Sequence, residues 1–369
     1  MSTMDTVGDG GHRCGVDRVP SGEDAAVRVL RTIAAVLLVV CGLLSPAGPA
    51  SAGSHRYAGY LFVSFTGENT ADGEQVHFGL SQGDDPLRWR ELGGGEPVLR
   101  STLGTKGVRD PFVIRSPRGD RFYLIATDLR MYGRDDWDQT TRHGSRSMVV
   151  WESKDLVRWS EPRLVQVAPE TAGNVWAPEA FYDPARGAYV VFWASTLYPA
   201  DDPGHTTKSH NRMMFATTKD FRTFSEPKVW FDPGHSVIDS TVVEHNGVYH
   251  RFSQDDRGVG GGGSTPCGRY ITQEKSTTLT SPGYSLVKEC VGKDAIVGGE
   301  GPLVFRSNTE KRWYLFIDEY GGRGYRPFET TDLNSGDWRP VADAQLPGKP
   351  RHGTVLPVTR AEYNRLAKI

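Results

Sequence analysis

Five side chains that can exchange protons occur at the starts of short apolar segments spread along this 369-residue chain. They belong to Asp110, Glu179, Asp239, Glu300 and His352. The segments are rich in Val, Ile, Leu and Phe, a composition typical of buried strands. Acids that share one site repel each other and lose solvent, so some carboxyl pKa values rise while others stay low. One protonated and one ionised carboxyl group are the pair that general acid–base catalysis requires.

Two recurring sequence patterns would place these side chains on equivalent strands. The first is a short apolar strand, a turn and a second strand rich in Tyr, Phe and Trp, and it begins at each of the four acids. The second is an aromatic strand-and-turn unit. It occurs at residues 153–162 and 218–227, with looser copies at 81–98, 276–287 and 330–341. Recurrence in a fixed order predicts one structural unit repeated five times.

The two ends of the chain complement each other. Residues 352–358 form a predicted strand with no partner after it, while 60–65 and 75–80 form a unit that lacks its first strand. If the last strand completes that unit, the ring of sheets closes without a long exposed edge. The sequence therefore predicts an all-β, five-bladed β-propeller, closed by pairing of the C-terminal strand with the N-terminal blade, whose inner strands bring the five side chains together. A generic β-sandwich would not explain five copies in the same order.

The N-terminal segment has the features of a secretory leader. Two arginines precede the apolar run 33–44, and an Ala-x-Ala cleavage site ends at Ala52. The run is too short to span a membrane, so we expect cleavage near Ala52, secretion and no stable membrane insertion. The predicted organisation is a signal peptide with an extended lead at 1–52 and one propeller domain at 53–369. A lipoprotein signal through Cys41 and the position of the true translation start are left open.

The cysteines and the net charge indicate a disulfide and exclude one class of partner. Cys14 and Cys41 fall in the predicted leader, which leaves Cys267 and Cys290. In an oxidising compartment these two most simply form a disulfide; the alternative is two buried free thiols. The 43 Lys and Arg residues against 45 Asp and Glu residues give a formal net charge of -2. We therefore expect no nucleic-acid partner, and we expect a monomer.

The residues around the five proton-exchanging side chains form an ordered set of short motifs. The motifs are Arg109-Asp110-Pro111, Trp176-Ala-Pro-Glu179, Ile238-Asp239, Glu300-Gly301-Pro302 and Arg351-His352-Gly353. In this order they resemble glycoside hydrolase family 43, whose members are five-bladed propellers that cleave with inversion. The resemblance covers residues 57–369, and its specificity lies in the order, because each motif alone is weak.

The resemblance implies a role for each matched residue. Asp110 matches the general base, Asp239 the acid that tunes the proton donor and orients the substrate, and Glu300 the general acid. His352 matches a histidine that helps to hold a metal ion or water, so a central structural Ca²⁺ near His352 is one option, although the chemistry requires no cofactor. Ser240 follows Asp239 where the family often has Pro, which is a departure from the pattern.

Each role has a structural alternative. Asp-Pro pairs elsewhere in this chain fit turns, and Asp110 differs from them by the apolar strand that follows it directly. Asp239 could instead cap the entry of its strand, and His352 could be a hydrogen-bonded structural histidine. Glu179 would either bind sugar hydroxyls or form a salt bridge with an arginine in the channel.

Aromatic rings pack on the apolar faces of sugars, so the predicted substrate-binding set combines Glu179 with nearby aromatic residues. These are Trp176, Trp193, Tyr325 and Phe328. The alternative is that such rings only fill the core between blades. The glycine-rich stretch 258–263 formally fits a dinucleotide-binding fingerprint, but no helix pattern follows it, and we expect a flexible loop beside the site.

The sequence therefore predicts a secreted, exo-acting, inverting glycoside hydrolase that releases a terminal furanose from a polysaccharide or oligosaccharide. Among family 43 members the chain looks most similar to α-L-arabinofuranosidases, with β-D-galactofuranosidase and β-xylosidase activities as alternatives. A retaining fructan hydrolase would need an Asp nucleophile on the first strand, and residues 60–64 contain no acid. A non-catalytic sugar-binding propeller is the remaining alternative, although binding alone does not require three acids on different inner strands.

Overall fold

The computed structural model describes residues 56–258 and 265–369. The predicted signal peptide, residues 1–52, lies outside the described residues, and so do residues 259–263 of the predicted glycine-rich loop, 258–263.

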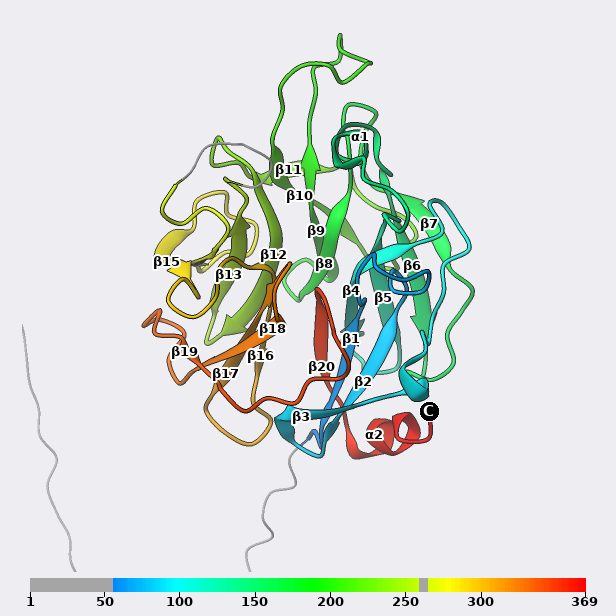
Figure 1. Ribbon diagram of the computed structural model, residues 1–369, viewed down its shortest axis with the longest axis vertical. Coiled ribbons are helices and arrows are strands. Elements are labelled where there is room, and N and C mark those ends of the chain that lie inside the picture. The colour runs from blue at the N-terminus through cyan, green and yellow to red at the C-terminus, as the bar shows by residue number, and fades with distance from the viewer. Residues whose placement is uncertain (1–55, 259–264) are drawn as a thin grey trace, which may run out of the picture. The chain divides into compact units, whose positions relative to one another are not determined.

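The described chain folds into five antiparallel sheets of four strands each. The sheets, from inner to outer strand and coloured along the chain in Figure 1, are as follows. Blade one consists of β20 (Gly353–Pro357), β1 (Tyr60–Ser64), β2 (His77–Gln82) and β3 (Asp85–Glu91). Blade two consists of β4 (Val108–Arg115), β5 (Phe122–Asp128), β6 (Ser147–Ser153) and β7 (Arg163–Gln166). Blade three consists of β8 (Trp176–Asp183), β9 (Ala188–Thr196), β10 (Asn211–Thr218) and β11 (Lys228–Phe231).

The last two blades follow the same strand order. Blade four consists of β12 (Val237–His245), β13 (Val248–Asp255), β14 (Ile271–Ser276) and β15 (Ser285–Val291). Blade five consists of β16 (Glu300–Arg306), β17 (Trp313–Glu319), β18 (Gly324–Thr330) and β19 (Arg339–Pro340). The inner strands contact one another in the circular order β4, β8, β12, β16 and β20. This arrangement confirms the predicted five-bladed propeller.

Blade one closes the ring. Strand β20 pairs antiparallel with β1, with Val355 opposite Phe62. The C-terminal strand therefore supplies the inner strand that the N-terminal blade lacks, as predicted. The next segment, helix α2 (Arg360–Leu366), begins with a capping box in which Thr359 and Glu362 each accept a backbone N–H of the other. Arg115 of blade two binds Glu362 at 2.6 Å, so the last helix is attached to the neighbouring blade.

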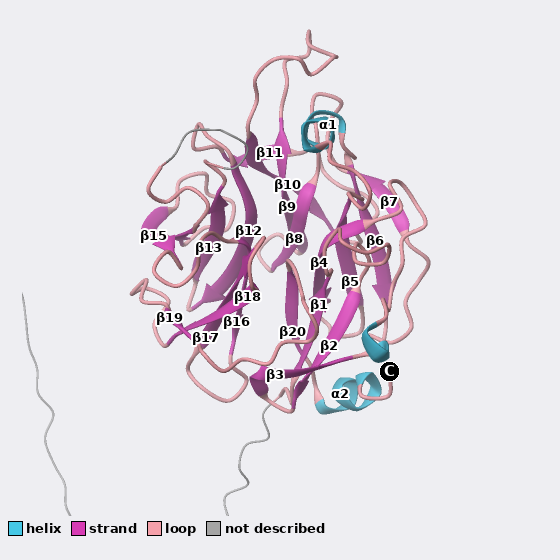
Figure 2. Ribbon diagram, viewed as in Figure 1, coloured by secondary structure: helices cyan, strands magenta, loops and turns pink. Residues whose placement is uncertain are grey.

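Apolar second strands form the cores between blades. Every residue of β5, β9 and β17 is buried, which explains why these segments read as continuous apolar runs. Four tryptophans are almost completely buried among them: Trp89, Trp151, Trp193 and Trp313. The helices α1 (Trp137–His143) and α2 lie outside the sheets, at opposite edges of the molecule in Figure 2. Among the described residues, no helix has both the length and the apolar character to cross a membrane.

The repeated strand-and-turn pattern corresponds to a side-chain-capped turn. After β6, the Ser153 hydroxyl accepts the N–H of Leu156, and the Asp155 carboxylate accepts the N–H of Val157 at 3.0 Å. After β10, Thr218 accepts the N–H of Phe221 in the same way. Local side-chain hydrogen bonds of this kind fix the turn, so the chain repeats these residue types wherever it repeats the turn.

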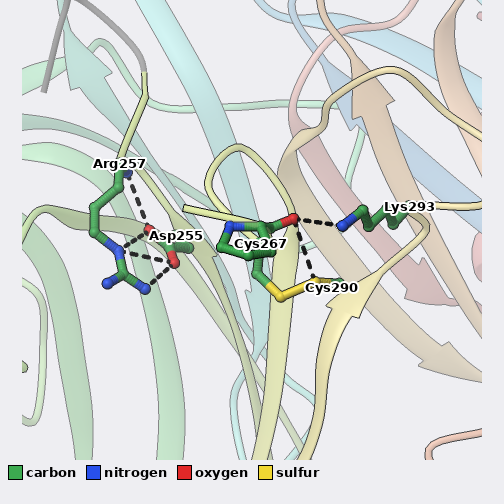
Figure 3. The surroundings of a disulfide bond; sticks show 6 residues. Asp255, Arg257, Cys267, Cys290 and Lys293 are labelled. Atoms are coloured by element: carbon green, nitrogen blue, oxygen red, sulfur yellow. Dashed lines mark hydrogen bonds and ion pairs between the residues drawn. A yellow bond between two sulfur atoms is a disulfide. The ribbon is translucent and has the colours of Figure 1, made fainter. Parts of the chain in front are cut away.

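A disulfide joins Cys267 to Cys290, with the two Cα atoms 4.7 Å apart, which confirms the predicted pairing. It links the segment before β14 to the end of β15. Figure 3 shows that the same segment is fixed further by Lys293, whose ammonium donates to the carbonyl of Pro266 at 2.8 Å. Asp255 and Arg257 form an ion pair at 2.5 Å beside it.

Candidate active site

Four of the five inner strands carry an irregularity where the predicted acids lie. Their register shifts at Arg109/Phe112, Trp176/Glu179, Ile238/Thr241 and Glu300/Leu303. Within these bulges, positive φ angles occur at Asp110 (53°), Ala177 (47°), Asp239 (54°) and Gly301 (51°). A bulge re-aims side chains, and a non-glycine residue at positive φ costs on the order of 1 kcal/mol or more. Four bulges at the same end of the inner strands indicate that the side chains they reorient have a function there.

The bulges correct one detail of the sequence interpretation. Asp110 and Asp239 occupy equivalent positive-φ positions, but Glu300 lies one residue before its equivalent position and Glu179 lies two residues after. The four acids therefore approach the centre from different heights and angles rather than as a symmetric ring. We call this end of the inner strands the carboxylate face.

His352 lies at the centre of the acidic group. Its Nδ1 is 3.3 Å from Oδ1 of Asp110 and 3.7 Å from Oδ2 of Asp239. Burial favours the neutral imidazole, but the charge of Asp239 and the hydrogen bond to Asp110 outweigh it and raise the pKa of His352 to about 9. His352 therefore contributes a buried positive charge that holds two acids from different blades together.

Asp110 is the acid that stays ionised. Burial alone would raise its pKa, but the hydrogen bond and charge of His352, the charge of Arg109 and the hydrogen bond of Thr127 bring that pKa below its ordinary value. The Thr127 hydroxyl donates to Oδ2 of Asp110 at 2.7 Å and accepts the N–H of Ala177 at 2.8 Å. One hydroxyl thus fixes this carboxylate to blade two and to the bulge of blade three.

Asp239 touches the strand that carries Glu300. Its Oδ2 accepts the N–H of Gly301 at 2.9 Å. Burial raises the pKa of Asp239 to about 6, and the nearby charge of His352 limits that rise. Ser240, the departure from the family pattern, directs its hydroxyl to Ser253 at 2.6 Å, inside its own blade.

Glu300 is held beside a buried ion pair. Arg351 contacts Oε1 of Glu300 at 2.6 Å and Oδ2 of Asp318 at 2.5 Å. Burial raises the pKa of Glu300 to about 8; the charge of Arg351 opposes this shift, and the charges of Asp318 and Asp239 add to it. This shift favours the protonated form that a general acid needs.

Glu179 is the second acid with a strongly raised pKa, and it differs from Glu300 in its exposure to solvent. Burial raises its pKa to about 8, and the charges of His352 and Asp239 act on it, so it belongs to the same group. Glu179 is only 4% exposed, whereas 24% of the Glu300 side chain is exposed. Of the two acids with a strongly raised pKa, Glu300 is the more accessible to a bound molecule.

The structure separates the predicted aromatic residues into two groups. Trp176 is partly exposed at the carboxylate face, at the start of β8. Trp193, Tyr325 and Phe328 are at most 3% exposed and pack in the cores between blades. Their prediction as sugar-binding rings is wrong, because each lies on a second or third strand whose side chains fill the space between sheets.

Tyr325 has a structural role instead. Its hydroxyl donates to the carbonyl of Gly301 at 2.8 Å and accepts the N–H of Gly353 at 2.9 Å. It therefore ties the inner strand of blade five to that of blade one, beside Glu300 and His352.

A central structural Ca²⁺ near His352 is one option that the family resemblance implies, and it stays a prediction. Within residues 56–258 and 265–369, no group of three or more His, Cys, Asp or Glu side chains is arranged to hold a metal ion. Nδ1 of His352 faces carboxylates directly and supplies the positive charge there.

Sequence reasoning missed three polar residues that bind the acids or the arginines beside them. Thr127 and Asp318 both lie near the ends of second strands, with Thr127 opposite Arg109 and Asp318 opposite Glu300 in the strand pairing. A polar residue that ends an otherwise apolar second strand was the available signal. The third is Glu74, which is completely buried and binds Arg109 at 3.2 Å; no recurring pattern marks it.

The comparison with protein families decides the classification. The model of a probable glycosyl hydrolase domain related to glycoside hydrolase family 43 matches residues 55–364. The chain belongs to this family. The resemblance inferred from the ordered motifs is therefore confirmed, and the propeller with its acidic carboxylate face is that of a glycoside hydrolase.

The chain is also similar to individual relatives. An α-L-arabinofuranosidase of Bifidobacterium longum is 32% identical over 314 residues, which cover 76% of this chain and 28% of the relative. The chain thus spans about a quarter of the length of that relative. An α-L-arabinanase of Penicillium chrysogenum, solved with arabinobiose, gives a TM-score of 0.49 at 14% identity and covers 80% of this chain and 79% of the other. An α-L-arabinofuranosidase of Coprinopsis cinerea from family 62 gives 0.46 at 16%, covering 69% and 75%.

Proposed function

We propose that this glycoside hydrolase is a secreted, exo-acting enzyme that releases terminal α-L-arabinofuranose from a polysaccharide or oligosaccharide with inversion. One observation carries the chemistry. Different inner strands bring an accessible carboxyl group whose pKa is raised, Glu300, and a carboxyl group whose pKa is lowered, Asp110, to one buried histidine and its neighbours. That is the pair of protonation states that a single displacement needs.

Glu300 donates its proton to the glycosidic oxygen as the bond to the anomeric carbon breaks. Asp110 accepts a proton from a water molecule that attacks the opposite face of the sugar, and the new C–O bond forms with inverted configuration. Thr127 and His352 hold the Asp110 carboxylate toward the centre, and Arg351 holds that of Glu300.

The other groups set the electrostatics of the pair. Asp239 lies between them, touching His352 on one side and the backbone next to Glu300 on the other. Its negative charge, when present, keeps the proton on Glu300. Glu179, nearly buried and protonated at neutral pH, offers a hydrogen-bond donor to a hydroxyl of the bound sugar.

The choice of arabinofuranose rests on the 32% identical relative. Discrimination between furanosides that differ by one exocyclic carbon amounts to about 1 to 3 kcal/mol in an apolar pocket. β-D-Galactofuranoside and β-xyloside are therefore the competing substrates in the test. Secretion is supported by the Ala-x-Ala site near Ala52 and by the Cys267–Cys290 disulfide, since disulfides persist in oxidising compartments. We propose that the secreted form is a monomer.

The test compares Glu300→Gln and Asp110→Asn with Glu226→Gln, a matched change at an exposed glutamate of the β10–β11 connection. Turnover is measured on 4-nitrophenyl α-L-arabinofuranoside, β-D-galactofuranoside and β-D-xyloside, and on arabinotriose. Nitrophenolate leaves without protonation, so Glu300→Gln should lose more activity on arabinotriose than on the nitrophenyl glycoside. Asp110→Asn should lose at least about a hundredfold on both, the low end of what a general base supplies.

Each result has a definite meaning. Wild-type turnover in either carboxyl variant eliminates the proposed roles. A clear preference for one of the other two glycosides replaces arabinofuranose as the substrate. No hydrolysis of any glycoside by the wild-type protein, together with saccharide binding, would favour a non-catalytic sugar-binding propeller.

A further inference from the structure

Trp137 is an exposed tryptophan that the chemistry above does not use. It is the first residue of α1, in the segment between β5 and β6, and 41% of it is exposed. Sugar rings present flat apolar faces that pack on aromatic rings, so an exposed indole beside the acids of a glycoside hydrolase is a candidate contact for the substrate.

Contacts with buried residues hold Trp137 in place. The guanidinium carbon of Arg109 lies 5.2 Å from the centre of the Trp137 ring and 4.7 Å from that of Phe65. Arg109 is bound by the completely buried carboxylate of Glu74 at 3.2 Å, and Glu74 also accepts the N–H of Met131 at 2.8 Å. The segment that carries Trp137 and the cation beneath the ring are thus fixed by one buried acid.

Two separate connections place Trp137 beside the catalytic centre. Arg109 immediately precedes Asp110 in β4. On the other side, Trp176 meets Trp137 edge to face, with ring centres 6.3 Å apart at 90°. Trp176 precedes Ala177, whose N–H is bound by the same Thr127 that holds Asp110. The exposed indole therefore lies at the edge of the carboxylate face, on the Asp110 side.

We propose that Trp137 is a binding platform for a sugar unit of the polymer other than the terminal one, with Trp176 as its side wall. Arg109 lies over the indole ring, and 41% of Trp137 is still exposed, which leaves indole surface available to the C–H face of a sugar ring. An exo-acting enzyme holds the terminal sugar at the acids, and the rest of the polymer must cross the edge of that site. This proposal rests on the proposed function. The Trp137 platform would make the enzyme favour polymeric substrates over small ones.

The test uses Trp137→Ala, with Trp137→Phe as the conservative variant. Leu286→Ala, at a 55% exposed leucine of β15 in blade four, is the matched control. The specificity constant kcat/KM is measured on soluble arabinoxylan and on 4-nitrophenyl α-L-arabinofuranoside. Binding to arabinoxylan is measured by affinity gel electrophoresis in an Asp110→Asn background, where cleavage cannot interfere.

We expect Trp137→Ala to lower kcat/KM on arabinoxylan about tenfold more than on the nitrophenyl glycoside, the effect of one aromatic stacking contact. Gel retardation by arabinoxylan should weaken in parallel, Trp137→Phe should recover part of both, and Leu286→Ala should change neither. Equal losses on both substrates, or no change in retardation, would overturn the platform, as would a lack of retardation of the Trp137-containing protein. Failure of the catalytic roles shows separately, as undiminished turnover by Asp110→Asn.

Discussion

Replacing Thr127 by valine removes one hydrogen bond to Asp110, the proposed base. Valine has nearly the same volume as threonine, so the packing around position 127 is kept. The Thr127 hydroxyl donates to Asp110 at 2.7 Å and the residue is 1% exposed. A hydrogen bond to a charged group contributes about 1.5 to 3 kcal/mol, which corresponds to about a tenfold to hundredfold change in an equilibrium. The bond lowers the pKa of Asp110, so its loss raises that pKa and protonates the base at a higher pH.

The assay is the pH dependence of kcat/KM for the wild-type protein, Thr127→Val and Thr127→Ser. The acidic limb should move to higher pH in Thr127→Val, with kcat/KM about tenfold or more lower on that limb, and Thr127→Ser should restore the wild-type profile. The valine also leaves the N–H of Ala177 without its acceptor, so the melting temperature is measured in parallel. A variant with lower stability but an unshifted acidic limb would show that Thr127 only supports the fold and would refute its role at Asp110.

Two further predictions concern stability. Cys267→Ser opens a loop of 23 residues and should lower the free energy of unfolding by about 3 kcal/mol; an unchanged urea midpoint would contradict this. The raised pKa values of His352, about 9 against 6.5, and Glu300, about 8 against 4.5, mean that the folded protein binds these protons more tightly than the unfolded chain. The proton on His352 stabilises the folded state fully below pH 6.5, and this stabilisation is lost as the pH rises to about 9. The proton on Glu300 stabilises the folded state in the same way, and its contribution is lost between pH 4.5 and about 8. Denaturation at pH 6 and pH 9 should therefore show lower stability at pH 9, and the reverse order would be inconsistent with these buried protons.

The order of the repeats predicted the propeller and its closure because the blades repeat the same strand pattern, and blades two and three also share the same capped turn. An apolar first strand followed by an aromatic second strand marks each blade, and the unpaired strand at 352–358 could only be completed at the other end of the chain. The acids were found because they lie at or near the starts of those first strands.

The aromatic residues could not be sorted in the same way. Trp176 and Trp193 look alike in sequence, yet one begins an inner strand at a bulge and the other lies in the middle of a second strand. Burial depends on how neighbouring blades pack, and a local sequence pattern does not contain that information. Trp137 was missed for the related reason that it lies outside the repeat, in a segment that only the contacts of Arg109 and Trp176 bring to the acids.

Supporting groups such as Thr127 and Asp318 were missed because their partners lie across a strand pairing. Thr127 binds Asp110 and Ala177 from two different blades. Such contacts become predictable only once the register between strands is known.

The central claim is that Glu300 and Asp110 act on opposite faces of one sugar in a single displacement. Proton NMR of the first sugar released from 4-nitrophenyl α-L-arabinofuranoside, recorded before mutarotation, tests this claim most directly. The β-anomer appearing first is the predicted result, and the α-anomer appearing first would show retention and contradict the account.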